Sequence, residues 1–401
     1  MEEVGRKGAF EPEEYARRRR IFREAMREQG LDGLLVTGLP DLRYLCGFSG
    51  SSGLALLLPR SGWFLTDFRY REQSREEVFG LRTVIYEEDI GRALRDILLR
   101  TGVGPEAGAE ARGRDGGEKA EGPAYGDDRA WDRLPRVGYD PHALTCAELS
   151  LYRRRLRGLV SLAPLRAGLT RLRSRKSSAE LELMRRGIRV AEEAFREALR
   201  DLEGTSTERE LALGLDYAAR RRGAEAMAFE TIVAGGKRSA LVHARPSQAG
   251  LTGAVVVDWG VVLGGYSSDC TRTLALGRVP GELRRAHRLI LEAQQRALEA
   301  VRPGVRASVV DRAAREILEK AGYGKAFGHG LGHGVGLEVH EAPNLSPRSR
   351  DILEEGMVVT VEPGVYLPGV GGVRVEDMVM VTRGGAEVLT TLSRSLDPSD
   401  Y

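Results

Sequence analysis

The chain has 401 residues, of which 42% are hydrophobic and 30% are charged, and its formal net charge at pH 7 is only +3. This length and composition are typical of a soluble globular protein with two domains. The small net charge argues against nucleic acid as a partner, and the absence of an apolar run of about 18 residues argues against a membrane span.

The cysteines and the N-terminal residues indicate a cytoplasmic protein. Cys46, Cys146 and Cys270 are far apart and form no Cys-x-x-Cys pattern, which favours a reducing compartment over a disulfide framework. The first 20 residues are charged throughout and lack the apolar segment of a signal peptide.

The first part of the chain alternates helix-like and strand-like segments. Residues 14–30 predict a helix that ends at Gly30, and we interpret its arginines as a solvated helix face rather than a nucleic-acid site. Short apolar runs bounded by glycine or proline predict buried strands at 33–38 and 53–59. A further strand is predicted at 62–70. This alternation predicts an α/β domain.

A break in the alternation and a change in composition predict the domain organisation. Residues 102–126 contain eight glycines, many charges and few apolar side chains, so we expect a flexible surface insertion. The composition changes near residue 165, which places the boundary within 163–176. The predicted N-terminal domain spans 1–165, and the predicted C-terminal domain spans 171–401.

The C-terminal domain opens with a strongly amphipathic helix, and Ser177 and Glu180 match a capping box at its start. The apolar face of this helix comprises Leu181, Met184, Ile188, Ala191 and Phe195. Further helices are predicted near 207–222, 281–301 and 307–321, and strands near 229–234, 254–273, 357–366 and 373–382. This mixture of elements predicts an α+β domain.

Two segments of the C-terminal domain resemble each other. They read VVVDWGVVLGGYSSD at 255–269 and VTVEPGVYLPGVGGVRVE at 359–376. Each is an apolar strand that ends in an acid, followed by a glycine turn and a second acid. We interpret the pair as an internal duplication of one β-hairpin.

The hairpin pairing brings acidic side chains together. A two-residue Gly264-Gly265 turn makes Asp258 and Asp269 diagonal cross-strand neighbours, with Cβ atoms up to about 7–8 Å apart. Glu362 and Glu376 repeat this arrangement in the second hairpin. Buried acids are normally paired with a cation or bind a metal. Salt bridges to arginine are the alternative, but they would have to arise twice.

Three of the six histidines lie in HGLGHGVGLEVHE, residues 329–341. A helical zinc motif is disfavoured, because each glycine would cost about 1 kcal/mol in a helix interior. In an extended chain, His329 and His333 point to the same side. This segment alone leaves two interpretations open, a metal or catalytic site and an incidental glycine-rich turn.

The four acids and at least one histidine indicate an oxygen-rich metal site. Such donors suit Mn²⁺, Co²⁺ or Fe²⁺ better than they suit a structural Zn²⁺ ion. Four negative charges balance two divalent ions, and two ions about 3.5–4 Å apart can share a water and deliver it as hydroxide. We therefore predict a dinuclear site.

The motifs of this chain resemble, in order and spacing, those of the pita-bread dinuclear metallopeptidases. They are VVVD with SSDCTRT, HGLGHGVGLEVHE, TVEPG and GVRVED. The most similar members are aminopeptidase P, an Xaa-Pro aminopeptidase, and prolidase, an Xaa-Pro dipeptidase. The resemblance is strong over 171–390, which implies a pita-bread (creatinase/aminopeptidase) fold there. DGLLVTGLPDLRYLCGFSGSSG and FLTDFRY also make 13–160 similar to the family's creatinase-type N-terminal α/β domain.

The resemblance implies a role for each residue that matches a family motif. The implied metal ligands are Asp258, Asp269, His333, Glu362 and Glu376. Asp269 and Glu376 would bridge two ions, most simply Mn²⁺ or Co²⁺ with Fe²⁺ or Zn²⁺ as alternatives, and Glu362 would take a proton from the bridging water. The implied substrate-contacting and supporting residues are His243, His340, His329, Arg374 and Tyr366. Trp259 departs from the family, which commonly has a smaller aromatic residue there.

The resemblance leaves two activities open. A dipeptidase must bind the free proline carboxylate, for which arginine is the natural partner. In many prolidases an arginine closely follows the motif that matches VHE, whereas this chain has Asn344 there and Arg348 and Arg350 further on. We therefore expect a homodimeric aminopeptidase P that cleaves Xaa-Pro bonds in peptides, with prolidase as the alternative. A non-enzymatic pita-bread binding module and a metal-free creatinase are disfavoured, because all five candidate ligands are present.

Overall fold

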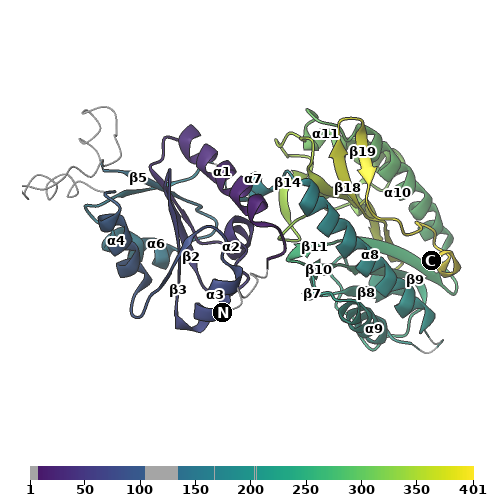
Figure 1. Ribbon diagram of the computed structural model, residues 1–401. Coiled ribbons are helices and arrows are strands. Elements are labelled where there is room, and N and C mark those ends of the chain that lie inside the picture. The colour runs from purple at the N-terminus through teal and green to yellow at the C-terminus, as the bar shows by residue number, and fades with distance from the viewer. Residues whose placement is uncertain (1–7, 104–133, 167, 203, 205) are drawn as a thin grey trace, which may run out of the picture. The chain divides into compact units, whose positions relative to one another are not determined.

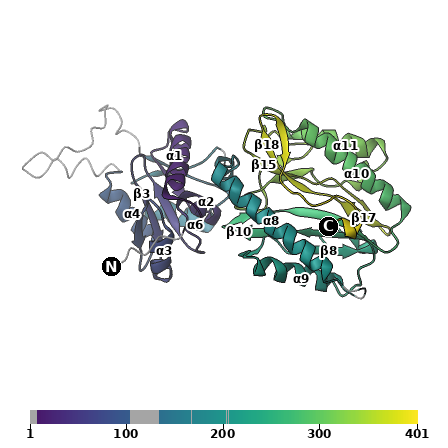
Figure 2. The ribbon, with the colours of Figure 1, turned by 45° about the vertical axis from the view of Figure 1, so that its right-hand side comes forward.

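The computed structural model describes residues 8–103, 134–166, 168–202, 204 and 206–401. The chain divides into two compact units, Met1–Leu172 and Arg173–Tyr401 (Figures 1 and 2). The insertion predicted at 102–126 lies, from residue 104 onward, outside the described residues. None of the described helices is long and apolar enough to cross a membrane.

The N-terminal unit contains a six-stranded sheet in the order β4-β3-β2-β1-β5-β6. Its strands are β1 (Gly33–Val36), β2 (Leu54–Leu57), β3 (Gly62–Thr66), β4 (Arg82–Ile85), β5 (Arg136–Tyr139) and β6 (Ser161–Pro164). Its helices are α1 (Pro12–Glu28), α2 (Leu39–Cys46), α3 (Arg71–Glu77), α4 (Ile90–Arg100) and α6 (Cys146–Arg155), and the short α7 (Thr170–Arg173) follows. The central strands β1 to β3 are buried along their whole length, as their uninterrupted apolar runs predict.

The strand predicted at 62–70 is wrong at its C-terminal end. β3 ends at Thr66, because the Asp67 side chain accepts a hydrogen bond from the Arg69 backbone N–H (3.0 Å) and caps a 3₁₀ helix over Phe68–Tyr70. A short polar side chain that bonds its own backbone in this way competes with strand pairing.

Two pairs of helices pack on the strands of the C-terminal unit (Figures 1 and 2). The first pair, α8 (Ser178–Arg200) and α9 (Glu208–Arg221), packs on β8 (Ile232–Gly235), β9 (Gly253–Trp259) and β12 (Cys270–Leu276). The second pair, α10 (Gly281–Ala300) and α11 (Ala307–Lys320), packs on β15 (Val358–Val361), β16 (Gly364–Leu367), β17 (Gly371–Arg374) and β18 (Asp377–Thr382). The remaining strands are β7 (Ala226–Met227), β10 (Val261–Leu263), β11 (Tyr266–Ser267), β13 (Gly332–Gly334), β14 (Glu341–Leu345) and β19 (Gly385–Val388).

Helix α8 begins as predicted. The Ser177 hydroxyl accepts a hydrogen bond from the Glu180 backbone N–H (3.2 Å), and the Glu180 carboxylate accepts one from the Ser177 N–H (2.9 Å), which confirms the capping box. On the buried face of α8, Phe195 stacks on Trp259 with ring centroids 4.2 Å apart. The Trp259 indole N–H donates to the Ala191 carbonyl (3.0 Å). Helix α8 therefore supplies both the stacking partner and the hydrogen-bond acceptor of the large Trp259 side chain.

The strand pair predicted over 254–273 is interrupted. A Cβ atom on Gly260 would collide with the Ser268 carbonyl oxygen, so the two backbones approach too closely for a side chain at this position. The interruption separates β9 and β12 from the short hairpin formed by β10 and β11. The acids of this segment, Asp258 and Asp269, flank the interruption.

A buried histidine of α10 should make the stability of the fold depend on pH. His287 is 5% exposed, and its Nε2 atom has no hydrogen-bond partner among the described residues. Burial lowers the pKa of His287 to about 4 from 6.5. Below pH 6.5 the unfolded chain therefore binds a proton that the folded chain excludes, and the free energy of unfolding should fall by up to about 3 kcal/mol between pH 6.5 and 4.

Denaturant unfolding at several pH values tests this prediction. The variant His287→Leu should lose part of the pH dependence between pH 6.5 and 4, whereas His142→Leu, at an exposed histidine, should keep it. Equal pH slopes for His287→Leu and the unmodified protein would contradict it.

Candidate functional site

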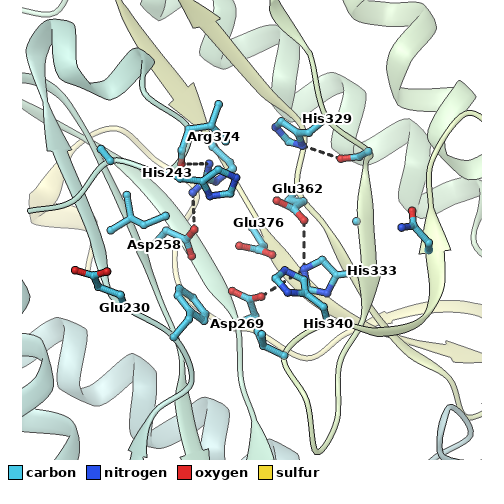
Figure 3. A pocket seen from close by; sticks show the side chains of 18 of the residues that line it. Glu230, His243, Asp258, Asp269, His329, His333, His340, Glu362, Arg374 and Glu376 are labelled. Carbon is cyan, nitrogen blue, oxygen red and sulfur yellow. Dashed lines mark hydrogen bonds and ion pairs between the residues drawn. The ribbon is translucent and has the colours of Figure 1, made fainter. Parts of the chain in front are cut away.

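One cavity of the C-terminal unit, with a volume of about 980 Å³, collects the predicted site residues (Figure 3). They are His243, Asp258, Asp269, His329, His333, His340, Glu362, Arg374 and Glu376. Tyr366 lies directly behind them, bonded to Arg374. Residues that are up to 133 positions apart in the sequence therefore meet in one place.

The first hairpin has the predicted register. Asp258 pairs with Thr271 across β9 and β12, and Leu263 pairs with Tyr266 across the Gly264-Gly265 turn. Asp269 lies two residues before Thr271, so Asp258 and Asp269 are diagonal neighbours.

The second hairpin does not repeat that geometry. Val361 pairs with Asp377 and Gly364 pairs with Arg374, which places Glu362 directly opposite Glu376. The hairpin closes through a three-residue loop after Leu367 rather than through a two-residue turn, and the longer loop shifts the register. The two acid pairs are therefore similar in sequence but not equivalent in structure.

The centre of the cavity is formed by Asp269, His333 and Glu376, which offer ligand atoms that all lie within 4.8 Å of one another. His333 Nε2 is 3.6 Å from Asp269 Oδ2 and 3.5 Å from Glu362 Oε1 (Figure 3). The other ring nitrogen, Nδ1, lies 3.0 Å from the Gly334 carbonyl oxygen, so it carries the proton and leaves the Nε2 lone pair facing the acids.

Arg374 bonds across the cavity. Its Nη2 atom donates to Asp258 Oδ2 (2.5 Å), Nη1 donates to the Tyr366 hydroxyl (2.9 Å), and Nε donates to Thr271 Oγ1 (3.0 Å). Arg374 is the last residue of β17 and lies two positions before Glu376, but it pairs with the acid of the other hairpin. Among the described residues, no arginine or lysine forms an ion pair with Asp269, Glu362 or Glu376. The salt-bridge alternative therefore holds for one acid of four.

Burial and mutual repulsion raise the pKa values of the acids. Burial raises the pKa of Glu362 to about 8 against the influence of Arg374, with Asp258 adding to the rise. Burial and the neighbouring acids hold the pKa values of Asp269 and Glu376 well above the ordinary range, and burial raises the pKa of Asp258. Burial, aided by His340, lowers the pKa of His333 to about 4, so its imidazole is neutral.

This donor set fits a divalent metal. Asp258 Oδ1 is buried and has no hydrogen-bond partner among the described residues, which is costly unless a cation binds it. The acids that repel one another would be stabilised by a cation, and the neutral His333 imidazole offers a free lone pair. Carboxylate oxygens with one imidazole nitrogen suit Mn²⁺, Co²⁺, Fe²⁺ or Zn²⁺.

The other histidines line the walls of the cavity. The His340 ring packs against the His333 ring with centroids 4.2 Å apart and planes at 68°. His329 Nε2 lies 3.0 Å from the Tyr366 hydroxyl, and burial lowers the pKa of His329 to about 4. His243 is on the Asp258 side of the cavity, and His340 is on the His333 side (Figure 3).

Two threonines that the sequence analysis did not select support the acids. Thr271 Oγ1 donates to Glu376 Oε2 (2.7 Å) and accepts from Arg374, so it links the two hairpins. Thr360 Oγ1 donates to Glu362 Oε1 (3.3 Å) and accepts from the His333 backbone N–H (3.1 Å). The register predicted from Gly264-Gly265 could have identified Thr271, because it places this residue directly opposite Asp258.

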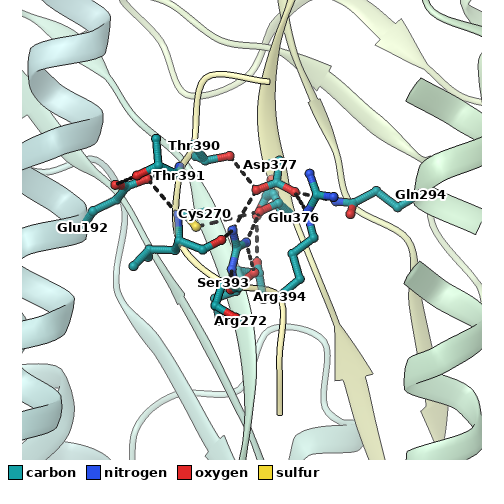
Figure 4. A network of polar contacts seen from close by, with 12 residues as sticks. Glu192, Cys270, Arg272, Gln294, Glu376, Asp377, Thr390, Thr391, Ser393 and Arg394 are labelled. Carbon is teal, nitrogen blue, oxygen red and sulfur yellow. Dashed lines mark hydrogen bonds and ion pairs between the residues drawn. The ribbon is translucent and has the colours of Figure 1, made fainter. Parts of the chain in front are cut away.

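A buried polar network holds the acid-bearing strands from behind (Figure 4). Arg272 is fully buried and donates to the Glu376 carbonyl (2.5 Å) and to Asp377 Oδ1 (2.7 Å). Asp377 also accepts hydrogen bonds from Gln294 (2.9 Å) and Arg394 (2.7 Å). The backbone around Glu376 is therefore fixed by groups that do not enter the cavity.

Comparisons with known proteins find a matching family for each of the two units. Residues 182–383 match the model of metallopeptidase family M24, and residues 18–175 match that of the creatinase/prolidase N-terminal domain. An Xaa-Pro dipeptidase of Pyrococcus furiosus is 43% identical over 227 residues, which cover 56% of this chain and 65% of that protein.

Two solved structures are similar over nearly the whole chain. The structure of an Xaa-Pro dipeptidase from Bacillus anthracis superposes with a TM-score of 0.84 at 32% identity and covers 96% of this chain and 99% of that one. The structure of an X-Pro aminopeptidase from Thermotoga maritima superposes with a TM-score of 0.78, also at 32% identity, and covers 93% and 99%.

Replacing Thr271 by valine should weaken metal binding. Thr271→Val keeps the shape of the side chain but removes the hydrogen bond to Glu376 and the acceptor for Arg374, and losing such support typically costs about 10–100-fold in metal affinity. Titration against a competing chelator measures this loss. Thr382→Val, at the far end of β18, is the matched control. Equal affinities for the two variants would show that Thr271 does not support the site.

Proposed function

The chain belongs to metallopeptidase family M24 and carries an N-terminal domain of the creatinase/prolidase kind, and on that premise we propose that it is a metal-dependent Xaa-Pro dipeptidase. Family membership confirms the predicted fold class, a creatinase-type N-terminal domain followed by a pita-bread domain, and the predicted enzyme class, a metallopeptidase. The observation that carries the proposal is the convergence of three buried acids, the partly buried Glu362 and a neutral histidine in one histidine-lined cavity.

The residues we assign as metal ligands are Asp258, Asp269, His333, Glu362 and Glu376. Their four carboxylates balance the charge of two divalent ions, for which Mn²⁺ and Co²⁺ are the first candidates. When bound, such ions polarise the scissile carbonyl and supply a water nucleophile at neutral pH.

One of these ligands, Glu362, would also move protons, and the remaining residues of the cavity would bind the peptide. Glu362 is assigned to take a proton from the attacking water and to return it to the leaving proline nitrogen. His243 and His340 lie on opposite sides of the acids, so a peptide placed over the acids is within reach of both (Figure 3). We assign these two histidines to substrate binding and to stabilisation of the tetrahedral intermediate, and His329 to the lining of the substrate pocket. Arg374 holds Asp258 in place.

Three observations bear on the length of the substrate. The Pyrococcus furiosus relative and the Bacillus anthracis structure are Xaa-Pro dipeptidases, which favours the alternative raised from the sequence over the aminopeptidase P expected first. Against this, Asn344 is exposed and lines the cavity at the position where an arginine would bind a proline carboxylate. The similarity to the Thermotoga maritima X-Pro aminopeptidase also keeps aminopeptidase P as the second candidate.

We further propose a cytoplasmic homodimer that acts on proline-containing peptides. All three cysteines are unpaired, in keeping with a reducing compartment. The dimer is an expectation from the family resemblance, and light scattering of the purified protein measures it.

Removing the metal should abolish activity. Protein reconstituted with Mn²⁺ or Co²⁺ should approach two ions per chain in elemental analysis, because the carboxylates of Asp269, Glu362 and Glu376 would otherwise stay uncompensated. Asp269→Ala and Glu376→Ala should lose both this stoichiometry and peptide hydrolysis. Full activity in exhaustively chelated protein is the result that would overturn the assignment.

His243→Ala and His340→Ala serve as controls for this experiment. Neither histidine is assigned to a metal, so both variants should keep their ions while kcat/KM falls by about 10²–10⁴-fold. Loss of metal from either variant would mean that the roles are assigned wrongly.

Substrate length separates the two candidate activities. The dipeptidase proposal predicts a kcat/KM at least tenfold higher for an Xaa-Pro dipeptide than for an Xaa-Pro-Yaa tripeptide, about 1.4 kcal/mol in transition-state binding. Asn344→Arg should increase this preference by adding a bidentate partner for the proline carboxylate. A preference for the tripeptide in the unmodified enzyme would instead make it an aminopeptidase P.

A further inference from the structure

A cluster of buried charges lies beside the cavity and contains none of the assigned ligands. Lys176 Nζ is 3.0 Å from Glu341 Oε2, and Arg173 Nη2 is 3.3 Å from Glu341 Oε1 and 2.6 Å from Glu338 Oε2. The side chains of Arg173, Lys176 and Glu341 are at most 2% exposed. We call Arg173, Lys176, Glu338 and Glu341 the Glu341 anchor. Buried ion pairs add little to stability compared with well-packed apolar residues, so such a cluster invites a functional explanation.

The two cations keep Glu341 ionised. Burial on its own would raise the pKa of Glu341, but Lys176 and Arg173 outweigh burial and the pKa lies below its ordinary value. The negative charge at Glu341 is therefore a permanent feature of the folded protein near neutral pH, and its two partners cannot be removed without leaving it uncompensated.

The loop that carries His340 is wrapped around this anchor. The Glu338 backbone N–H donates to Glu341 Oε1 (3.2 Å), and a Cβ atom on Gly336 would come within 2.8 Å of Lys176 Nζ. The Gly336 carbonyl accepts from the Ser267 N–H (2.7 Å), which ties the same loop to β11 of the first hairpin. Residues 336–341 are thus held at both ends, by the anchor and by the strand that leads to Asp269.

No hydrogen bond among the described residues orients the His340 ring. Within the part of the chain that the structure describes, no hydrogen bond is formed by its ring nitrogens, and its one ring contact is the edge-on packing against His333. The position of His340 is therefore set by its own backbone, which continues directly into Glu341.

We propose that Glu341, held by Lys176 and Arg173, is a positioning residue that sets His340 against the substrate. The proposal rests on the proposed function, in which His340 contacts the substrate. It assigns a role to Lys176 and Arg173, each of which contacts a glutamate 165 residues further along the chain, Glu341 and Glu338 respectively.

A double-mutant cycle on the Mn²⁺-loaded enzyme tests the proposal. Lys176→Met should lower kcat by about 10–100-fold, as small misplacements of catalytic groups do, while KM changes little and the metal content is unchanged. In a His340→Ala background, Lys176→Met should cause no further loss, because a positioning residue acts only through the group that it positions. Additive losses would overturn the proposal.

Two further variants separate positioning from general damage. Lys176→Arg restores the cation and should recover most of the lost kcat. Arg175→Ala removes the neighbouring side chain, which is exposed and bonds Glu354 and the Glu355 carbonyl instead of the anchor, and it should leave kcat unchanged. A loss in Arg175→Ala equal to that in Lys176→Met would show that any disturbance of this segment impairs the enzyme.

Hydrogen–deuterium exchange gives a readout that does not depend on activity. The backbone amides of residues 336–342 should exchange faster in Lys176→Met than in the unmodified protein, and unchanged exchange would overturn the proposal whatever the substrate. If Lys176→Met does not fold, Glu338→Ala removes one partner of Arg173 at a half-exposed site and should show the same change to a smaller degree. Failure to cleave any Xaa-Pro peptide would refute the proposed function separately, because the exchange of this loop is measured without a substrate.

Discussion

The repulsion among four closely spaced carboxylates, three buried and one partly buried, is the constraint around which the C-terminal unit is organised. Burial raises the pKa values of all four acids, and Arg374 compensates Asp258 alone, while the neighbouring acids disfavour the charged form of the other three. Such a site is unfavourable for the protein alone and becomes favourable only with a bound cation. The fold must therefore hold the acids together before the metal arrives, and it does so through strand pairing and the side chains of Thr271 and Arg272.

The supports of the acids lie outside the cavity for the same reason. Thr271 joins the two hairpins through one hydroxyl, and Arg272 fixes the carbonyl of Glu376 from the opposite side. A flexible scaffold would let the acids separate and relieve their repulsion. The density of hydrogen bonds around Arg272 and Asp377 opposes that relaxation (Figure 4).

Features with local causes could be predicted from the sequence. The capping box at Ser177 and the register of the first hairpin each depend on residues a few positions apart, and both were correct. The prediction that the second hairpin repeats the geometry of the first was wrong, because a three-residue loop cannot be told from a two-residue turn in a run that contains several glycines. The interruption at Gly260 and the ion pair between Arg374 and Asp258 depend on contacts between segments far apart in the sequence. The spacing of hydrophobic residues does not reveal such contacts.

The buried charged groups of Arg173 and Lys176 limit where the chain can be cut or recombined between its two units. A border between compact units is usually an exposed linker that tolerates cutting and rejoining. Here the first residues after the border insert their charges into the interior of the second unit. Proteolysis after Lys176 would detach Arg173 and Lys176 from the second unit and leave the Glu341 carboxylate without its counter-ions. Proteolysis before Arg173 would keep both cations beside Glu341. Recombination that exchanges the N-terminal unit for another is therefore confined to junctions upstream of residue 173.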